Sequence, residues 1–427
     1  MNLRHKWVMF AILLGWHAVG DAQTCMYSGA GLGLYGPLHG VVAFPPNDPI
    51  KLDIRTLPVD PNSTKQICTV DTQPPCGSIL WPHPSFGSKD RTSGIRYYVV
   101  DSRTQPMVPV AIGSYARESD PDTGTTWAPM PPDSSAIEGG GQPGQDNHAL
   151  IIDRYGCWAY EFYHAAYKGG VWTADHAAIW DLTNNEERPY GWTSTDAAGL
   201  PVFPILVKYE EAHSGAIRHA LRCEFANSRN AAVLPAHHYT MNAATGWPQM
   251  GARWRLKSSF DTTLGGRATV EVKAILDALK KYGCIMADNG GGGSGWMVDG
   301  TSDPRWNDGQ LHDQLAGVKL KNFEFVTNNP DGSPMTSYGP QGTKANWPPG
   351  PAPKVSHFTA TPATIAPGES TTLSWKASGA SYAIITPDIG PVRGTGVTVS
   401  PASSKTYTLF LTNQYGRTTA HTKVKVR

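Results

Sequence analysis

The sequence lacks a net charge of either sign, because 36 Lys and Arg balance 35 Asp and Glu to leave a formal charge of +1. The basic residues form no stripe along the chain, which argues against a surface built to grip a phosphate backbone. No apolar run approaches the roughly 20 residues that a membrane-spanning helix requires. We therefore expect neither a nucleic-acid partner nor a membrane span.

Several catalytic signatures are also absent. The chain has no GxSxG elbow, no HExxH helix and no P-loop, which disfavours the usual serine hydrolases, zinc proteases and nucleotide hydrolases. A GxGxxG match at residues 31–36 follows no predicted strand and precedes no predicted helix, so it does not indicate a dinucleotide site. No cysteine belongs to a CxxC pair with metal-ligand spacing. We expect no cofactor and no metal site.

The N-terminus has the pattern of a secretory signal. Arg4 and Lys6 precede a short apolar run at residues 7–14, and residues 19–22 offer small side chains for cleavage. The pattern predicts a signal peptide over residues 1–22 and a mature protein that is secreted, periplasmic or on the cell surface.

The cysteine count fits that compartment. Six cysteines, an even number, follow the expected cleavage point, and in an exported chain this favours disulfides. Cys68 and Cys76 enclose a short polar loop, so they are the best single pairing.

The composition favours an all-β fold. Forty-five Gly and 35 Pro punctuate many short segments, as in proteins with many strands. Residues 148–153 and 158–163 flank a short turn as a hairpin would, and residues 253–257 alternate like a half-buried strand. One helix is predicted over residues 270–282, ending at Gly283. We expect a β-sandwich or jelly-roll body with one packed helix.

A proline-rich segment divides the chain. Residues 346–353 form a stiff linker between a body at residues 23–345 and a C-terminal module at residues 354–427. Phe358, the run 372–375 with Trp375, and the run 406–409 closely resemble bacterial immunoglobulin-like repeats appended to exported enzymes and surface proteins. This resemblance implies a small β-sandwich with Trp375 in its core, acting as a spacer.

The body resembles a family of exported proteins from soil bacteria. The resemblance rests on the run GWTSTDAAGL at residues 191–200, on residues 274–290, and on the run DPRW at residues 303–306. It implies export and supports the domain limits. It implies no mechanism, because the family has no settled activity.

Carboxylates at the ends of predicted strands, with tryptophans nearby, suggest carbohydrate chemistry. Glycoside hydrolysis needs one protonated and one ionised carboxyl group, and a flat indole packs against a sugar ring. The candidate acid, nucleophile or base residues are Asp181, Asp196, Glu210 and Asp288, and the candidate sugar platforms are Trp180, Trp192 and Trp306. An aspartate at a strand end is also an ordinary turn-forming residue, so a structural role stays open for each. The main hypothesis is an exported protein that hydrolyses a polysaccharide.

Two alternatives remain. A polysaccharide lyase would use His237 or Tyr239 as its base and Arg253 to neutralise the sugar carboxylate. Satisfied hydrogen bonds near the core would equally explain a buried histidine. The second alternative is a non-catalytic carbohydrate-binding or surface protein with a lectin-like body.

Overall fold

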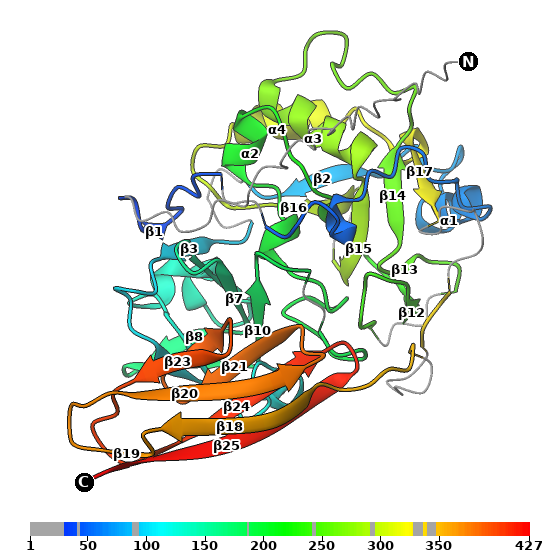
Figure 1. Cartoon of the computed structure of the whole chain (residues 1–427). Helices are drawn as coiled ribbons and strands as arrows, with labels where there is room; N and C mark the ends of the chain where they lie inside the picture. The colour runs from blue at the N-terminus through cyan, green and yellow to red at the C-terminus, as the bar shows by residue number, and fades with distance from the viewer. Residues whose placement is uncertain are drawn as a thin grey trace, which may run out of the picture.

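The computed structural model describes residues 30–40, 43–87, 94–185, 188–240, 245–290, 295–327, 336–339 and 347–427. The predicted signal peptide, Cys25 and the first residue of the predicted linker, Asn346, lie outside these ranges. The described chain is mainly β, as predicted, with a body and a C-terminal module (Figure 1). None of its helices is long and apolar enough to cross a membrane.

A five-stranded sheet forms the centre of the body. Its strands in spatial order are β1 (Gly33–Leu34), β3 (Tyr97–Val100), β6 (Ala149–Asp153), β7 (Trp158–Tyr163) and β10 (His176–Asp181). The predicted hairpin is confirmed, because β6 and β7 pair antiparallel. Leu150 and Ile152 enter one hydrophobic core, whereas Ala149 and Ile151 enter another on the opposite face. Burial on both faces explains why these strands are continuously apolar.

A mixed six-stranded sheet shares the first core. Its order is β17 (Phe323–Val326), β14 (Arg253–Leu256), β15 (Cys284–Asn289), β11 (Leu221–Phe225), β16 (Gly295–Asp299) and β2 (Trp81–Ser85). The strand predicted as half-buried, β14, is buried along its whole length. The alternation of charged and apolar residues did not indicate an exposed face. Arg255 is buried, where it forms an ion pair with Glu324 and donates to the carbonyl oxygens of Ile54 and Leu57.

Helices accompany this sheet. The described residues contain α1 (Ser63–Val70), α2 (Tyr209–His213), α3 (Val270–Lys281) and α4 (Asp308–Leu315). The predicted helix is α3, which begins where the Thr269 hydroxyl accepts from the Val272 amide at 3.3 Å. Figure 1 shows α2, α3 and α4 gathered together at one end of the body, and the expectation of a single helix was wrong. The three others are short, so their apolar spacing extends over too few turns to stand out.

Two smaller sheets complete the described body. The four-stranded sheet runs β5 (Thr125–Ala128), β4 (Val108–Ile112), β9 (Val171–Ala174), β8 (Ala166–Lys168), and β12 (Arg229–Ala232) pairs with β13 (Gln249–Met250). Val110, Ala128 and Trp172 of the four-stranded sheet line the second core. The central sheet is therefore covered on both faces.

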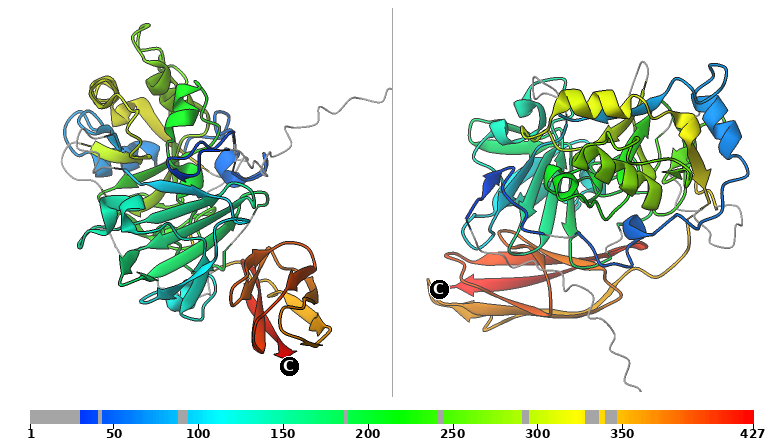
Figure 2. Two further views of the ribbon diagram at one scale, coloured as in Figure 1. Left: turned by 90° about the vertical axis from the view of Figure 1, so that its left-hand side faces the viewer. Right: turned by 90° about the horizontal axis from the view of Figure 1, so that it is seen from above.

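The C-terminal module is a two-sheet sandwich. One sheet is β18 (Lys354–Thr361), β20 (Thr371–Ser378), β23 (Gly396–Val399), and the other is β19 (Thr364–Ile365), β25 (Gly416–Val426), β24 (Lys405–Asn413), β21 (Tyr382–Thr386), β22 (Gly390–Val392). Trp375 lies in its core, as predicted. Figure 2 shows the module as a distinct layer beside the body.

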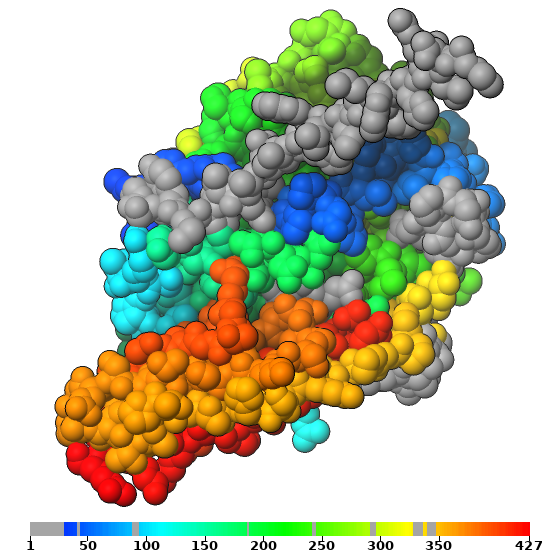
Figure 3. Space-filling view, viewed as in Figure 1, coloured from blue at the N-terminus to red at the C-terminus, as the bar shows by residue number. Residues whose placement is uncertain are grey.

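The module packs against the body rather than standing apart from it (Figure 3). Tyr382, Ile384 and Phe410 of the module join the second core of the body. The buried carboxylate of Asp120 in the body accepts from the Tyr382 hydroxyl at 2.8 Å and from Arg417 Nη2 at 2.5 Å. The contact therefore combines apolar packing with buried charge.

Two disulfides lie within the described residues. The predicted Cys68–Cys76 bridge is confirmed, and Cys223–Cys284 joins β11 to β15. No described cysteine is free. The second bridge links two strands that carry the charged residues of the candidate site.

Candidate active site

Three neighbouring strands bring charged side chains to one face of the six-stranded sheet. Arg222 and Glu224 lie two residues apart on β11 and so point the same way. Asp288 lies on β15 directly opposite Glu224, and Asp299 ends β16 on the other side of β11.

A register shift places Asp288 in that position. Cys223 pairs with Met286, but the next residue, Glu224, pairs with Asp288, so Ala287 is the extra residue of a β-bulge. Without the bulge, Glu224 would face an alanine. The Ala287 carbonyl instead accepts from the Ala198 amide at 2.8 Å, which ties the loop bearing Asp196 to this strand. Bulges commonly redirect side chains next to functional sites.

The loop that carries Asp196 is fixed from several sides. The Ser194 hydroxyl donates to the Leu200 carbonyl at 2.5 Å, and the Thr195 hydroxyl donates to Glu161 Oε2 at 3.1 Å. Glu161 is fully buried on β7. The loop therefore holds Asp196 without depending on the charged cluster alone.

Arg222 stands at the centre of four carboxylates. Its Nε lies 3.2 Å from Asp196 Oδ2, Nη1 lies 2.7 Å from Asp299 Oδ2, and Nη2 lies 3.3 Å from Asp288 Oδ2. Nη1 also contacts Glu224 Oε1. One buried cation therefore faces four acidic groups, which it cannot neutralise alone.

Burial, together with repulsion from neighbouring acidic groups, raises the pKa values of Asp196, Asp288 and Asp299. Burial raises the pKa of Asp196 to about 8, although Arg222 opposes this effect. Burial and the nearby Glu224 carboxylate raise the pKa of Asp288 to about 6, and the same two causes raise the pKa of Asp299. The cluster therefore retains protons near neutral pH.

Two members of the cluster reach solvent. The Asp288 side chain is 32% exposed and that of Glu224 is 14% exposed, whereas Asp196 and Asp299 are buried. A substrate can approach only the exposed pair.

A charged histidine lies close to this pair. His148 Nδ1 donates to Glu138 Oε2 at 2.6 Å and Nε2 donates to the Thr195 carbonyl at 3.0 Å, which requires both nitrogens to be protonated. Burial disfavours the charge, but Glu138 outweighs burial and raises the pKa of His148 to about 9. The ring of the half-buried Tyr163 lies 5.5 Å from the His148 ring, between centroids.

Of the four predicted carboxylates, the structure brings Asp196 and Asp288 together. Asp181 lies elsewhere, where it binds Arg393 of the module at 2.8 and 2.5 Å. Glu210 does not follow a strand but lies in the first turn of α2, where the positive helix end favours an acidic side chain. Its Oε2 accepts from the Leu38 amide at 3.2 Å.

Two of the three predicted tryptophans, Trp180 and Trp306, lie in the hydrophobic core. Trp180 is buried and donates to Glu161 Oε2 at 3.0 Å. Trp306 is buried and donates to the Thr301 carbonyl at 2.9 Å. Trp192 is half-buried, with the Arg417 guanidinium 4.8 Å from its ring centroid.

The residues named for a lyase are buried in separate surroundings. His237 Nδ1 donates to the Arg188 carbonyl at 2.6 Å, and burial lowers the pKa of His237 to about 4. Tyr239 is also buried. Arg253 is 1% exposed and donates to the carbonyls of Pro49 and Tyr282, so it does not face a sugar carboxylate.

Sequence analysis missed Arg222, Glu224, Asp299 and the Glu138–His148 pair. The sequence pattern could have identified Arg222 and Glu224, because they occupy alternate positions of an otherwise apolar strand. The described residues contain no group of three or more His, Cys, Asp or Glu side chains arranged to hold a metal ion.

No protein-family model and no curated protein matches the chain. Two solved structures match 18% of the chain at 18% identity: a chimeric titin Z1Z2-Z1Z2 tandem carrying a fibronectin peptide, with a TM-score of 0.16, and a chimeric titin Z1Z2 carrying a decorin peptide, with a TM-score of 0.14. The matches cover 50% and 95% of those chains, and at such TM-scores they carry no argument.

Proposed function

We propose that this protein is an exported carbohydrate-active enzyme that hydrolyses a glycosidic bond in a polysaccharide. Asp288 is the general acid, and Glu224 is the nucleophile or base. One observation carries the assignment: these two partly exposed carboxyl groups lie opposite each other on neighbouring strands and contact the same guanidinium.

The reaction divides the roles between the two groups. Asp288, whose pKa is raised to about 6, gives its proton to the leaving oxygen. Glu224, in contact with Arg222, attacks the anomeric carbon or activates a water molecule. Arg222 orients both carboxylates, and buried Asp196 and Asp299 surround it.

Export is supported by chemistry as well as by the signal pattern. Two disulfides lie in the described body, and such bonds persist in oxidising compartments. A polymeric substrate outside the cell would meet the two partly exposed carboxylates near the C-terminal ends of the central strands β11 and β15.

The test is a screen of the purified protein against neutral and acidic polysaccharides. Reducing ends report hydrolysis, and ultraviolet absorbance of unsaturated products reports a lyase. We expect new reducing ends without unsaturated products. Asp288→Asn and Glu224→Gln should each lower the rate by roughly 10²- to 10⁴-fold, the range for removal of an acid or base group.

Asp277→Asn is the matched control. Asp277 lies on the exposed surface of α3 in a pair with Lys273, so its loss should leave the rate unchanged. Unsaturated products would favour the lyase instead. Binding of a polysaccharide with no cleavage by the wild-type protein would favour the non-catalytic alternative.

A further inference from the structure

A cavity of about 250 Å³ lies beside α2 and contains no member of the carboxylate cluster. Its walls come from α2 and the residues that flank it, at 203–219, and from an earlier segment that includes Ala43 and Lys51. The volume lies just below the range of about 300–1,000 Å³ that is usual for drug-sized ligands. A smaller molecule would therefore fill it.

The charged residues that line this cavity leave one positive charge in excess. Apart from His219, they are three basic residues and two acidic ones: Lys51, Lys208, Arg218, Glu210 and Glu211. Three positive groups minus two negative ones leave +1. A ligand with a single negative charge would balance this excess.

Lys208 does not supply the excess charge, because it is compensated within the protein. It is 4% exposed, and its ammonium group donates to the Leu206 carbonyl at 3.0 Å and to Glu211 Oε2 at 3.2 Å. Burial alone would raise the pKa of Glu211, but Lys208 and His219 outweigh it and lower the value to about 2. Lys208 and the ionised Glu211 therefore neutralise each other.

Lys51 and Arg218 are the cations that remain. Neither forms an ion pair with a carboxylate of the described residues. Lys51 is half-buried and donates to the Phe44 carbonyl, which uses one of the three donors of an ammonium group, and Arg218 is exposed. Burial lowers the pKa of Lys51 to about 8 despite the charges of Asp48 and Glu211, as expected for a cation that lacks a close partner.

The apolar residues of the wall favour an organic ligand over an inorganic anion. Ala43 and Ala216 are half-buried and line the cavity, together with the buried side chains of Leu38 and Pro204. Pockets that combine apolar walls with a few charged groups bind ligands that combine the same two features. Phosphate or sulfate would leave the alanines without a contact.

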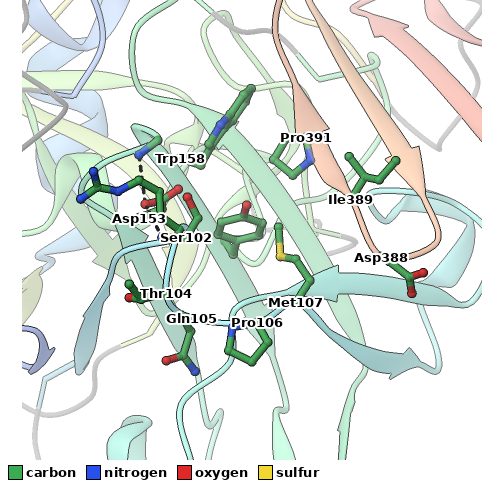
Figure 4. A pocket seen from close by; sticks show the side chains of 13 residues that line it. Ser102, Thr104, Gln105, Pro106, Met107, Asp153, Trp158, Asp388, Ile389 and Pro391 are labelled. Atoms are coloured by element: carbon green, nitrogen blue, oxygen red, sulfur yellow. Dashed lines mark hydrogen bonds between the residues drawn. The ribbon is translucent and has the colours of Figure 1, made fainter. Parts of the chain in front are cut away.

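A larger cavity in the described chain has the opposite charge. It measures about 490 Å³, lies where the module meets the body, and is lined by residues that include Asp153 and Asp388 (Figure 4). The basic residue in its lining is Arg103, which binds Asp101 at 2.6 Å. This cavity therefore disfavours an anion and serves as a comparison within the same protein.

We propose that the cavity beside α2 binds a small organic carboxylate, with its carboxylate group between Lys51 and Arg218 and its organic body against Ala43 and Ala216. Free organic acids and the uronic acids of glycans both carry this group, and the test separates them. The site is distinct from the carboxylate cluster, so it does not depend on the proposed hydrolysis.

The test is calorimetric titration of the full chain with benzoate, hexanoate and glucuronate. Benzamide, which has nearly the shape of benzoate without its charge, and inorganic phosphate are the comparison ligands. The cavity variants are Lys51→Gln and Arg218→Gln.

Each variant has a matched control. Lys280→Gln matches Lys51→Gln, because Lys280 is a half-buried lysine that donates to backbone carbonyls, those of Ser258 and Phe260, away from the cavity. Arg103→Gln matches Arg218→Gln, because Arg103 is an arginine that lines the other cavity.

We expect at least one carboxylate to bind, and each cavity variant to weaken it about tenfold, as for the loss of one hydrogen bond between charged groups. The control variants should keep the wild-type affinity. The affinity should also fall as the pH rises above about 8, where Lys51 loses its proton. If circular dichroism shows Lys51→Gln to be unfolded, Arg218→Gln must still give the loss, because Arg218 is an exposed residue.

The pattern of ligands identifies the source of the carboxylate. Binding of benzoate or hexanoate supports a free organic acid, and binding of glucuronate alone supports an acidic sugar. The proposal would be overturned if no carboxylate bound, if benzamide or phosphate bound as tightly, or if the control variants weakened binding as much as the cavity variants. Hydrolase activity bears on none of these outcomes, so either proposal can fail without the other.

Discussion

Glu224 on β11 lies opposite Asp288 on β15, one position beyond the register shift, and both carboxylates contact the guanidinium of Arg222. The bulge and the loop anchored on Ala287 lie next to this pair, and the Cys223–Cys284 bridge joins the same two strands one residue before Glu224 and four residues before Asp288. The pair is therefore supported by covalent and hydrogen-bonded structure on both strands. Such preorganisation is what acid–base chemistry requires.

The rate of hydrolysis should depend on the protonation of Asp288. The pKa of Asp288 is raised to about 6, so the group is a proton donor below that pH and loses its proton above it. We expect kcat to fall about tenfold per pH unit above pH ~6. Initial rates from about pH 4 to 9, with circular dichroism to confirm folding, measure this. A rate that rises above about pH 7 would contradict Asp288 as the acid.

The stereochemistry of the reaction follows from the strand spacing. Neighbouring strands lie about 4.8 Å apart, and Glu224 and Asp288 are register partners with carboxylates on one guanidinium. This arrangement is closer to the ~5–5.5 Å carboxyl separation of retaining glycosidases than to the ~6.5–9.5 Å of inverting ones. We expect retention of the anomeric configuration, as measured by NMR of the first products. Inversion would mean that Glu224 activates water rather than attacking directly.

The sequence was informative where local patterns decide structure. Two segments flanking a short turn predicted the β6–β7 hairpin, helical spacing predicted α3, and the polar loop predicted the Cys68–Cys76 bridge. The end of the apolar run at residues 284–287 also singled out Asp288, whereas Asp196 was named from a Gly- and Ser-flanked loop.

The remaining features depend on contacts between distant parts of the chain. Asp181 looked like a site residue because its partner, Arg393, lies 212 residues later in the module. The register shift that sets Asp288 beside Glu224 leaves no mark in either strand alone. The proline-rich linker suggested separable units, but composition cannot show that Arg417 reaches the buried carboxylate of Asp120.

Stability should fall on the alkaline side of neutral pH. The pKa of His148 is about 9 in the folded protein against an ordinary value of 6.5, and that of Asp196 is about 8 against 3.8. A raised folded pKa gives stability that is present below the unfolded value and lost as pH rises to the folded value. Between about pH 6.5 and 9 both groups lose protons that folding had retained. We therefore expect the free energy of unfolding to drop by a few kcal/mol over this range.

Urea unfolding at intervals across that range measures the drop. Glu138→Gln is the diagnostic variant, because it removes the carboxylate that raises the pKa of His148. The variant should show a shallower alkaline decline than the wild type. A wild-type stability that is flat from about pH 6.5 to 9 would contradict the assignment.

The module should stabilise the loop that carries Asp196, and Arg417 is the residue that makes the connection. Its guanidinium binds Asp120 at 2.5 Å and lies 4.8 Å from the Trp192 ring centroid. Asp120 also pairs with Arg188, whose Nη2 donates to the Thr193 carbonyl at 3.2 Å. Arg417→Met would remove one cation from this buried network. Loss of one partner of a buried ion pair typically lowers the free energy of unfolding by about 3–5 kcal/mol.

Arg393→Met is the matched comparison, because Arg393 is also a module arginine that pairs with an aspartate of the body. Arg393 is 40% exposed, and it contacts Asp181 and residues 156–158, away from the loop at 191–200. An ion pair with such an exposed partner contributes at most about 1 kcal/mol to the free energy of unfolding. We expect Arg417→Met, but not Arg393→Met, to accelerate amide hydrogen exchange in residues 191–200 and to lower the rate of hydrolysis. If both variants change exchange in that loop equally, the module stabilises the body only through general docking, and the specific connection through Asp120 is wrong.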